Sequence, residues 1–253
     1  MKETYKEIKT IAKTTGLEVN VNRTKMLIHS RRNPRQTGEI NMIGDGIEIA
    51  EDFIYLGSKS HKDGEENHEI TRRVKLANNA YFSLLSVFRS KDIHRAIKTK
   101  IYKTMIRPVL YYGCEGWTLN KKEESVINSF ERKILRRIYG PIKENGIWRI
   151  RYNKELYKLH KEPEISMTIK LKRLQWAGHV QRMDKERIPK KILYSTIDGR
   201  RHAGKPRTRW IDAVEEDAKK LMGVRNWKRA AQDREEWRGL IREAKARHRA
   251  VAP

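Results

Sequence analysis

The spacing of apolar residues changes near residue 69, and this change constrains the fold more than any other feature of the sequence. Before it, short apolar runs alternate with turn signals, as in residues 17–28, 40–49 and 53–57, a pattern typical of strands. From Glu69 onward, every periodic segment repeats at helical spacing. The sequence therefore predicts an α+β protein that is mostly α. We expect a small antiparallel hairpin region, then a helical bundle and a basic helical C-terminal region.

The first region is predicted to contain one helix followed by short strands and turns. Residues 1–15 are predicted to form a polar helix stopped by Gly16, because glycine suits a left-handed helix cap. Residues 17–28 then indicate two short strands. Residues 40–49 indicate a hairpin with Asp45-Gly46 at its turn, and Phe53–Gly57 an apolar strand that ends in a glycine.

Three apolar stripes follow at helical spacing and predict a bundle. The stripes run from Val74 to Phe88, from Ile93 through Ile97 and Ile101 to Met105 before Pro108, and from Val126 to Ile138. Further helices are expected beyond Pro141. The tryptophans of the last two, Trp210, Trp227 and Trp237, fall on apolar stripes, which favours core positions over base-stacking platforms. The expected domains are residues 1–68, 69–140 and 141–253.

The charge of the chain favours nucleic acid as its partner. The net charge is +25, with 57 basic and 32 acidic residues, and the excess is concentrated. Residues 71–130 hold 12 basic and 4 acidic side chains, and residues 131–210 hold 23 and 8. Such an excess is the electrostatic footprint of a nucleic-acid-binding protein, although an anionic membrane surface or a ribosome would also attract it.

Other classes of protein are disfavoured. The sequence has no apolar run of transmembrane length and no signal-peptide core, so we expect a soluble intracellular protein, in the nucleus or the cytoplasm. Its single cysteine, Cys114, permits neither an internal disulfide nor a cysteine-based zinc site and is expected to be a small buried side chain. His160 and His179 lack carboxylate or thiol companions at ligand spacing, so no metal site is expected.

The candidate phosphate contacts lie in two groups. The first is on the outer faces of the predicted helices, and the second is in a loop that contains glycine and proline. The glycines of this loop let the main chain approach a phosphate backbone closely. They are Arg72, Arg73, Lys98, Lys100, Lys103, Arg136 and Arg137 on the helices, and Arg200, Arg201, Lys205, Arg207 and Arg209 in the loop. The alternative is that these cations only solvate a bundle and a linker.

Several segments resemble one known family, in one order along nearly the whole chain. Gly16–Lys25 reads Gly-Leu-Glu-Val-Asn-Val-Asn-Arg-Thr-Lys, Phe53–Ser58 reads Phe-Ile-Tyr-Leu-Gly-Ser, and Arg107–Gly113 reads Arg-Pro-Val-Leu-Tyr-Tyr-Gly. Arg173–Met183 and Gly204–Trp210 follow. Together these segments resemble the end of the palm, the primer grip, the thumb and the C-terminal region of non-LTR retrotransposon reverse transcriptases.

The resemblance implies an RNA-directed DNA polymerase lineage and a template–primer duplex of RNA or DNA as partner. It implies that Lys25 assists the departing pyrophosphate in a complete enzyme and that Tyr55, Leu56 and Gly57 press the primer end toward the active site. The alternatives are a surface lysine and an ordinary strand and turn.

The departures from the family limit what the chain does alone. The family's metal-binding aspartates would lie upstream of Met1, and the sequence contains no Asp-Asp pair. No catalytic residue is therefore expected, and Mg²⁺ is implied only for a complete polymerase. One hypothesis is a truncated, inactive polymerase remnant that holds template–primer through phosphate contacts. The other is a domesticated or accessory RNA- or DNA-binding module with no polymerase role.

Overall fold

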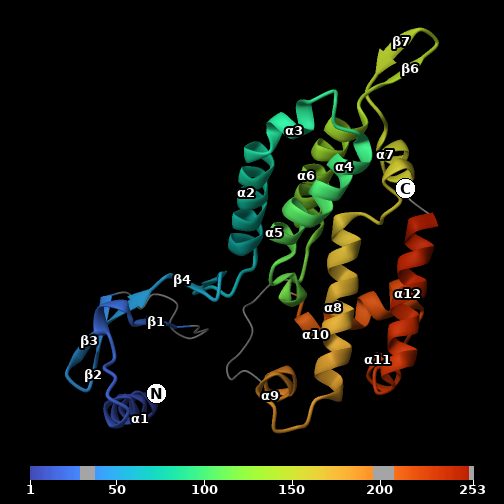
Figure 1. The fold of residues 1–253 in the computed structure, drawn as a ribbon. Coiled ribbons are helices and arrows are strands. Elements are labelled where there is room, and N and C mark those ends of the chain that lie inside the picture. The colour runs from blue at the N-terminus through green and yellow to red at the C-terminus, as the bar shows by residue number, and fades with distance from the viewer. Residues whose placement is uncertain (29–37, 196–207, 251–253) are drawn as a thin grey trace. The chain divides into compact units, whose positions relative to one another are not determined.

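The structure is a computed structural model that describes residues 1–28, 38–195 and 208–250 (Figure 1). The chain divides into two compact units. The first contains residues 1–69, and the second takes up the described residues from Ile70 onward. Long helices and three small sheets make up the described chain, which confirms the predicted α+β, mostly α, class.

The first unit packs one helix against a small sheet. Its elements are α1 (Lys2–Thr14), a 3-10 turn (Val21–Arg23), β1 (Lys25–Leu27), β2 (Gly38–Met42), β3 (Asp45–Ala50), β4 (Asp52–Tyr55) and β5 (Ser58–His61). Tyr5 of α1 is buried with Met42 and Ile47 of the sheet. The Tyr5 hydroxyl also donates a hydrogen bond of 2.8 Å to the Asp45 carboxylate. This core is small, so the polar link between helix and sheet matters for its stability.

The central strand of the sheet is β3. It pairs with β2 in antiparallel register and with β1 in parallel register. The predicted strand at residues 17–21 is wrong, because this segment runs into the 3-10 turn instead. There the Asn20 side chain accepts a hydrogen bond from the Arg23 N–H, and such local capping competes with strand pairing.

The turn between β2 and β3 differs from the predicted one by two residues. Ile43 and Gly44 occupy it, with φ of 57° and 87°, whereas Asp45 and Gly46 already belong to β3. Two successive residues with positive φ are the mark of a type I′ turn, which matches the twist of the strands. Asp45 is held in the strand by hydrogen bonds from Tyr5 and from Lys9 of α1. A tertiary contact thus decides the register.

The second unit is helical apart from one hairpin. Its elements are α2 (Asn67–Ser83, which begins in the first unit), α3 (Leu85–Arg89), α4 (Arg95–Ile101), a π-helical segment (Tyr102–Ile106), α5 (Arg107–Tyr111), a 3-10 turn (Cys114–Gly116), α6 (Lys121–Tyr139), β6 (Ile142–Glu144), β7 (Ile147–Arg149), α7 (Asn153–His160), α8 (Ile165–Arg182), α9 (Ile188–Tyr194), α10 (Trp210–Asp217), a second π-helical segment (Ala218–Met222), α11 (Trp227–Ala230) and α12 (Arg234–Ala250).

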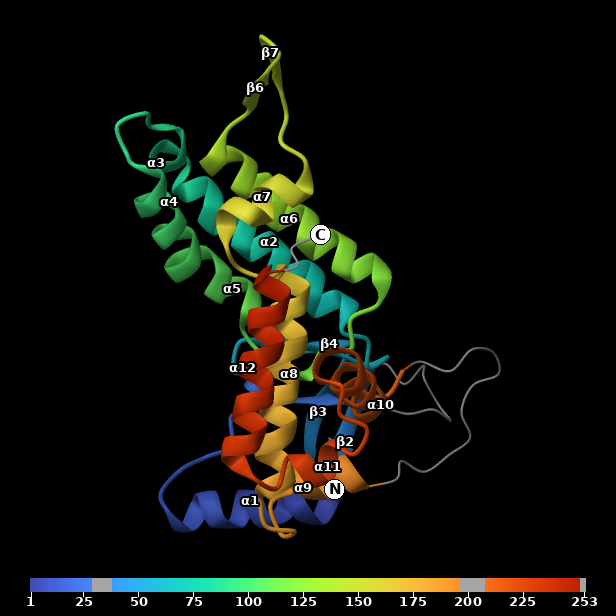
Figure 2. The ribbon, with the colours of Figure 1, turned by 90° about the vertical axis from the view of Figure 1, so that its right-hand side faces the viewer.

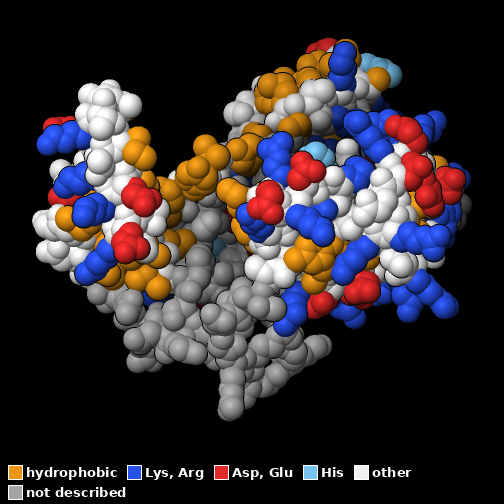
Figure 3. Space-filling model, turned by 90° about the horizontal axis from the view of Figure 1, so that it is seen from below, with side chains coloured by type: hydrophobic (Ala, Val, Ile, Leu, Met, Phe, Trp, Pro, Cys, Tyr) orange, Lys and Arg blue, Asp and Glu red, His pale blue; other side chains and the backbone are white. Residues whose placement is uncertain are grey.

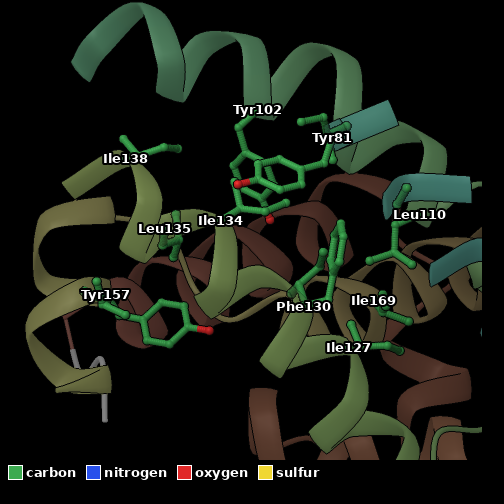
Figure 4. Close-up of a cluster of buried hydrophobic side chains, with 14 of the residues drawn as sticks. Tyr81, Tyr102, Leu110, Ile127, Phe130, Ile134, Leu135, Ile138, Tyr157 and Ile169 are labelled. Carbon is green, nitrogen blue, oxygen red and sulfur yellow. The ribbon is translucent and has the colours of Figure 1, made fainter. Parts of the chain in front are cut away.

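Two apolar clusters hold this unit together. The first surrounds α6, where Phe130, Ile134 and Leu135 meet side chains of neighbouring helices (Figure 4). The second lies between α8 and the C-terminal helices, and α8 and α12 run side by side in both ribbon views (Figures 1 and 2). Because α8 contributes Ile169 to the first cluster and Leu174 to the second, it joins the two cores.

The tryptophans expected in the core lie where the stripes placed them. Trp227 and Trp237 are fully buried in the second cluster, and Trp210 packs against it. The helix predicted from Trp227 onward is divided into α11 and α12. The helix predicted from Trp210 is continuous, because α10 runs directly into the π-helical segment Ala218–Met222.

The second predicted stripe is wrong in part, although its Ile101 packs against the first cluster. Ile97 and Met105 are exposed, whereas Tyr102, Ile106 and Leu110 are buried without remaining exposure. The helix also does not end at Pro108, because α5 continues through it. The buried face is displaced by one residue already in α4, where Lys98 is buried and Ile97 exposed, and the π-helical segment Tyr102–Ile106 continues this face to Pro108.

A hairpin follows α6 where only helices were expected. Strands β6 and β7 pair in antiparallel register, and Asn145 and Gly146 form the turn with φ of 50° and 84°. Asn-Gly is the preferred sequence of a two-residue type I′ turn. The strands are only three residues each, too short to show an alternation of apolar and polar residues. The Asn-Gly dipeptide was therefore the sequence signal that could have predicted this hairpin.

Candidate nucleic-acid interface

The β4–β5 hairpin presents apolar side chains to solvent. All four residues of β4 are exposed, and so are the turn residues Leu56 and Gly57. The turn has φ of 47° at Leu56 and 80° at Gly57, again the type I′ geometry. Tyr55 is 65% exposed. A run of exposed apolar residues on a hairpin is typical of a surface that binds another molecule.

Polar contacts at its base position this hairpin. Lys59 pairs with Asp52 across the two strands at 3.0 Å, and Lys62 forms an ion pair with Glu51. The Lys59 N–H also donates a 2.9 Å hydrogen bond to the buried Glu69 at the start of α2. The apolar tip is thus supported by a polar base and not by an apolar core of its own.

Lys25 lies in β1 and is exposed. Its ammonium contacts the Glu48 carboxylate at 3.0 Å, and the two residues face each other in the β1–β3 pairing. Exposed ion pairs contribute little to stability. Lys25 is thus a surface lysine whose charge is neutralised by Glu48.

The predicted phosphate contacts of α2 and α4 differ in accessibility. Arg73 is buried, with its guanidinium 4.4 Å from the centre of the Tyr112 ring, and Arg72 is half-buried. Lys98 is buried as well, and its ammonium donates hydrogen bonds to the carbonyl oxygens of Phe88 (3.2 Å) and Ser90 (2.5 Å). Lys98 therefore joins α3 to α4, so it is not positioned to meet a phosphate.

The remaining helical cations also divide into two kinds. Lys103 contacts Glu162 at 3.4 Å, and Arg136 donates a 2.7 Å hydrogen bond to Asn153. Lys100 and Arg137 are exposed and have no ion-pair partner in the described chain. Of the seven helical candidates, these two are the most available to a phosphate backbone.

Most of the predicted loop cations fall outside the described residues. Arg200, Arg201, Lys205 and Arg207 belong to this group, and Arg209 is exposed at the start of α10. The Arg209 N–H donates to the Asp212 carboxylate at 3.2 Å, which caps the helix. Over the visible surface, Lys and Arg side chains are spread with Asp and Glu among them (Figure 3).

The β6–β7 hairpin adds a surface that sequence reasoning missed. Ile147 and Trp148 are strongly exposed, Trp148 at 66%, and Lys143 lies opposite Trp148 in the strand pairing. The Arg149 guanidinium lies 4.4 Å from the centre of the exposed Tyr152 ring. Exposed aromatic rings beside cations are the usual means of binding unpaired bases.

Buried ionisable groups in this unit serve the fold. Burial raises the pKa of Glu131, against the opposing effect of Arg107. The Glu131 carboxylate accepts hydrogen bonds from the hydroxyls of Tyr102 (3.0 Å) and Tyr157 (3.1 Å) and from the Ile165 N–H (2.9 Å). These partners lie on elements surrounding α6, so Glu131 connects the helices of the first apolar cluster.

Two further buried groups have shifted pKa values. Cys114 is fully buried, which confirms the prediction of a small buried side chain, and this burial raises its pKa to about 12. Burial, Arg107 and Lys103 lower the pKa of His160 to about 3. His160 is therefore neutral at physiological pH, and neither ring nitrogen has a hydrogen-bond partner among the described residues.

Three segments that are distant in sequence meet at the 3-10 turn Cys114–Gly116. The Arg173 guanidinium donates to the Trp117 carbonyl and pairs with the buried Asp217. The Trp210 indole N–H donates a 2.8 Å hydrogen bond to the Glu115 carbonyl. The turn is therefore fixed by side chains from α8 and α10, and Arg173 and Trp210 have structural roles.

Comparison with known proteins finds a transposon-derived relative. The chain is 24% identical over 234 residues to an uncharacterized transposon-derived protein of Caenorhabditis elegans, an alignment that covers 90% of this chain and 83% of that protein. No protein-family model matches the chain. No solved structure matches it either. In the described part of the chain, no helix is both long and apolar enough to cross a membrane.

Proposed function

We propose that this chain derives from a transposable element and binds nucleic acid through phosphate contacts of its helical unit. The similarity to a transposon-derived protein along nearly the whole chain supports the origin. The observation that carries the binding is the charge excess of residues 71–210, together with exposed cations such as Lys100 and Arg137. Phosphate contacts of this kind fix position on a duplex but do not read its sequence.

We further propose that the element is a non-LTR retrotransposon and that the chain corresponds to the end of the palm, the thumb and the C-terminal region of its reverse transcriptase. The β4–β5 hairpin supports this assignment, because it presents Tyr55 and Leu56 at an exposed turn on a fixed base. In this reading the hairpin contacts the primer end and the helical unit holds the duplex.

The first experiment measures binding and polymerisation on the same sample. Fluorescence anisotropy is recorded with RNA–DNA, DNA–DNA and single-stranded probes across a salt series, beside a primer-extension assay. We expect binding that weakens steeply with salt, because counterions are released from the phosphates. We expect no extension by the chain alone. Absence of binding at moderate salt contradicts the proposal, and extension would show that the active site has been misplaced.

Single substitutions then locate the phosphate contacts. Lys100→Ala and Arg137→Ala should each weaken binding to all duplexes alike, and each should lower the slope of log affinity against log salt by about 0.9, because one phosphate is no longer neutralised. Lys220→Ala is the matched control, because Lys220 is also exposed but pairs with Glu216. If the control changes the slope as much as the test variants do, the phosphates do not bind where we place them.

The second candidate function is a domesticated or accessory RNA- or DNA-binding module with no polymerase role. It is favoured by the β6–β7 hairpin, whose exposed Trp148 suits unpaired bases. The two functions differ in their need for the β4–β5 hairpin, so the test changes only its exposed side chains.

The variant Ile54→Thr, Tyr55→Thr, Leu56→Asn removes the three most exposed apolar side chains of this hairpin. The two threonines favour strand structure. The asparagine forms an Asn-Gly pair with Gly57, which suits the positive φ values of this turn. A polymerase remnant should lose its preference for a duplex with a recessed 3′ end over a blunt duplex. An accessory module should bind both probes as before.

A further inference from the structure

A cluster of two histidines and one aspartate lies where β5 meets α2, in a segment that the preceding proposals do not use. His61 ends β5, Asp63 lies in the turn after it, and His68 is in the first turn of α2. One ligand atom from each of the three side chains lies within 4.8 Å of the other two. Imidazole nitrogen and carboxylate oxygen are the donors that Zn²⁺ and similar divalent ions take in proteins.

Both histidines of the cluster contact the Asp63 carboxylate. The Nδ1 atom of His61 is 2.8 Å from Oδ1 of Asp63, and Nε2 of His68 is 3.3 Å from Oδ2 of Asp63. Ligands bound at about 2.0 to 2.1 Å in a tetrahedron stand roughly 3.3 Å apart. The two histidines contact different oxygens of the same carboxylate, and the His68 contact already has about the spacing that a zinc ion requires.

The backbone holds the aspartate in place. The Gly64 N–H donates to the His61 carbonyl at 2.9 Å, which closes a turn around Asp63. Gly64 has φ of 69°, a conformation that glycine adopts without strain. The Glu65 N–H donates to Oδ1 of Asp63 at 2.8 Å. The carboxylate is thus oriented toward the two imidazoles by the turn that carries it.

The two imidazole rings are stacked, with centroids 4.0 Å apart and planes inclined by 18°. Lone pairs of stacked rings run nearly parallel, so binding one ion requires the rings to rotate until the lone pairs converge. The side chain of His68 is 37% exposed, which leaves room for this rotation. Asp63 is 40% exposed, so water can complete the coordination on the open side.

We propose that His61, Asp63 and His68 form a site for a divalent transition-metal ion of the Zn²⁺ class, with the remaining coordination positions taken by water. Such an ion connects the end of β5 to the first turn of α2. It therefore fixes the base of the β4–β5 hairpin, which Lys59 and Glu69 already anchor through a hydrogen bond. The site does not depend on nucleic-acid binding, so either proposal stands if the other fails.

The alternative is that the cluster is a hydrogen-bonded His–Asp–His group with no metal affinity. The test uses full-length, tag-free protein that has been stripped with a chelator. Zn²⁺ binding is measured by isothermal titration calorimetry, and Co²⁺ is used as a spectroscopic probe because its visible absorption reports coordination. We expect one ion per chain and a visible Co²⁺ spectrum that added Zn²⁺ abolishes.

Substitutions assign the site. His61→Ala, His68→Ala and Asp63→Asn should each lower Zn²⁺ affinity by about 10- to 100-fold or more, since loss of a ligand costs at least as much as loss of a group that supports a ligand. His179→Gln is the matched control, because His179 is exposed and lies in α8. It should leave the affinity unchanged.

Histidine-selective ¹⁵N NMR of the unmodified chain gives a readout that does not depend on folding of the variants. Zn²⁺ should shift the ring nitrogens of His61 and His68 and leave those of His179 in place. The proposal is overturned if sub-millimolar Zn²⁺ does not bind. It is equally overturned if the ¹⁵N shifts fall on other histidines, or if folded His61→Ala and His68→Ala proteins bind as well as the original chain.

Discussion

Gly178 lies in the interior of α8, where an alanine normally stabilises a helix, and we predict that Gly178→Ala destabilises this one. A Cβ atom built at Gly178 stands 3.0 Å or less from three atoms of the Trp237 indole ring. The ring has little freedom to move away. It is almost fully buried, and its Nε1–H donates a 3.0 Å hydrogen bond to the Leu174 carbonyl.

Two effects of opposite sign decide the outcome. Replacing glycine by alanine in a helix interior favours folding by about 1 kcal/mol. Forcing a methyl group into a packed core costs about 1–3 kcal/mol, and displacing the indole from its buried hydrogen bond costs a further 1–3 kcal/mol, roughly. The net change expected for Gly178→Ala is therefore a loss of about 1–5 kcal/mol in the free energy of unfolding.

Urea denaturation followed by tryptophan fluorescence measures this change. All six tryptophans lie between Trp117 and Trp237, so the signal reports only the helical unit. Gly239→Ala is the matched control, since Gly239 is in α12 and a Cβ atom there meets nothing within 4 Å. The control should gain up to about 1 kcal/mol. If Gly178→Ala raises the denaturation midpoint as the control does, the close packing of α8 against Trp237 is refuted.

Three further predictions concern buried polar groups. Glu131→Leu should destabilise the helical unit by about 3–5 kcal/mol in the same urea assay, because it leaves the Arg107 charge buried and unpaired. The pKa of His160 is about 3 in the folded chain against 6.5 ordinarily, so stability should fall as pH drops below 6.5, by about 2 kcal/mol at pH 5. His160→Leu should remove this dependence, whereas His179→Gln should not. Lys98→Met should lower stability by about 1–3 kcal/mol, because its hydrogen bonds to buried carbonyl groups are removed, and it should leave the salt slope of nucleic-acid binding unchanged.

The sequence predicted those parts of the fold that depend on backbone preferences and on the spacing of apolar residues. The helix stop at Gly16, the fold class and the buried tryptophans follow from φ preferences and from periodicity. The stripe ending at Met105 failed at Ile97 and Met105 because the buried face lies one residue further along, at Lys98, Tyr102 and Ile106. A pattern of apolar residues could not place it there, because the buried residue of α4 is a lysine.

The candidate site was less predictable than the fold, because accessibility depends on tertiary packing. Lys98 and Lys100 are two residues apart and equally basic, yet one bonds buried carbonyl groups and the other faces solvent. No sequence pattern near them distinguishes the two. The cluster of His61, Asp63 and His68 was missed for a different reason. Its spacing of two and five residues matches no common ligand motif, and only the turn before α2 brings the three side chains together.

Several residues of the segments that carry the family resemblance have structural roles. Arg173 pairs with Asp217, Gly178 admits the Trp237 ring, and Trp210 bonds the Glu115 carbonyl. A chain can keep such residues for packing alone, so they are no evidence that nucleic-acid binding is retained. Retained binding has to be sought in side chains that the fold does not need. Lys100, Arg137 and the tips of the two exposed hairpins meet that condition, and the binding variants are accordingly placed on Lys100, Arg137 and the β4–β5 tip.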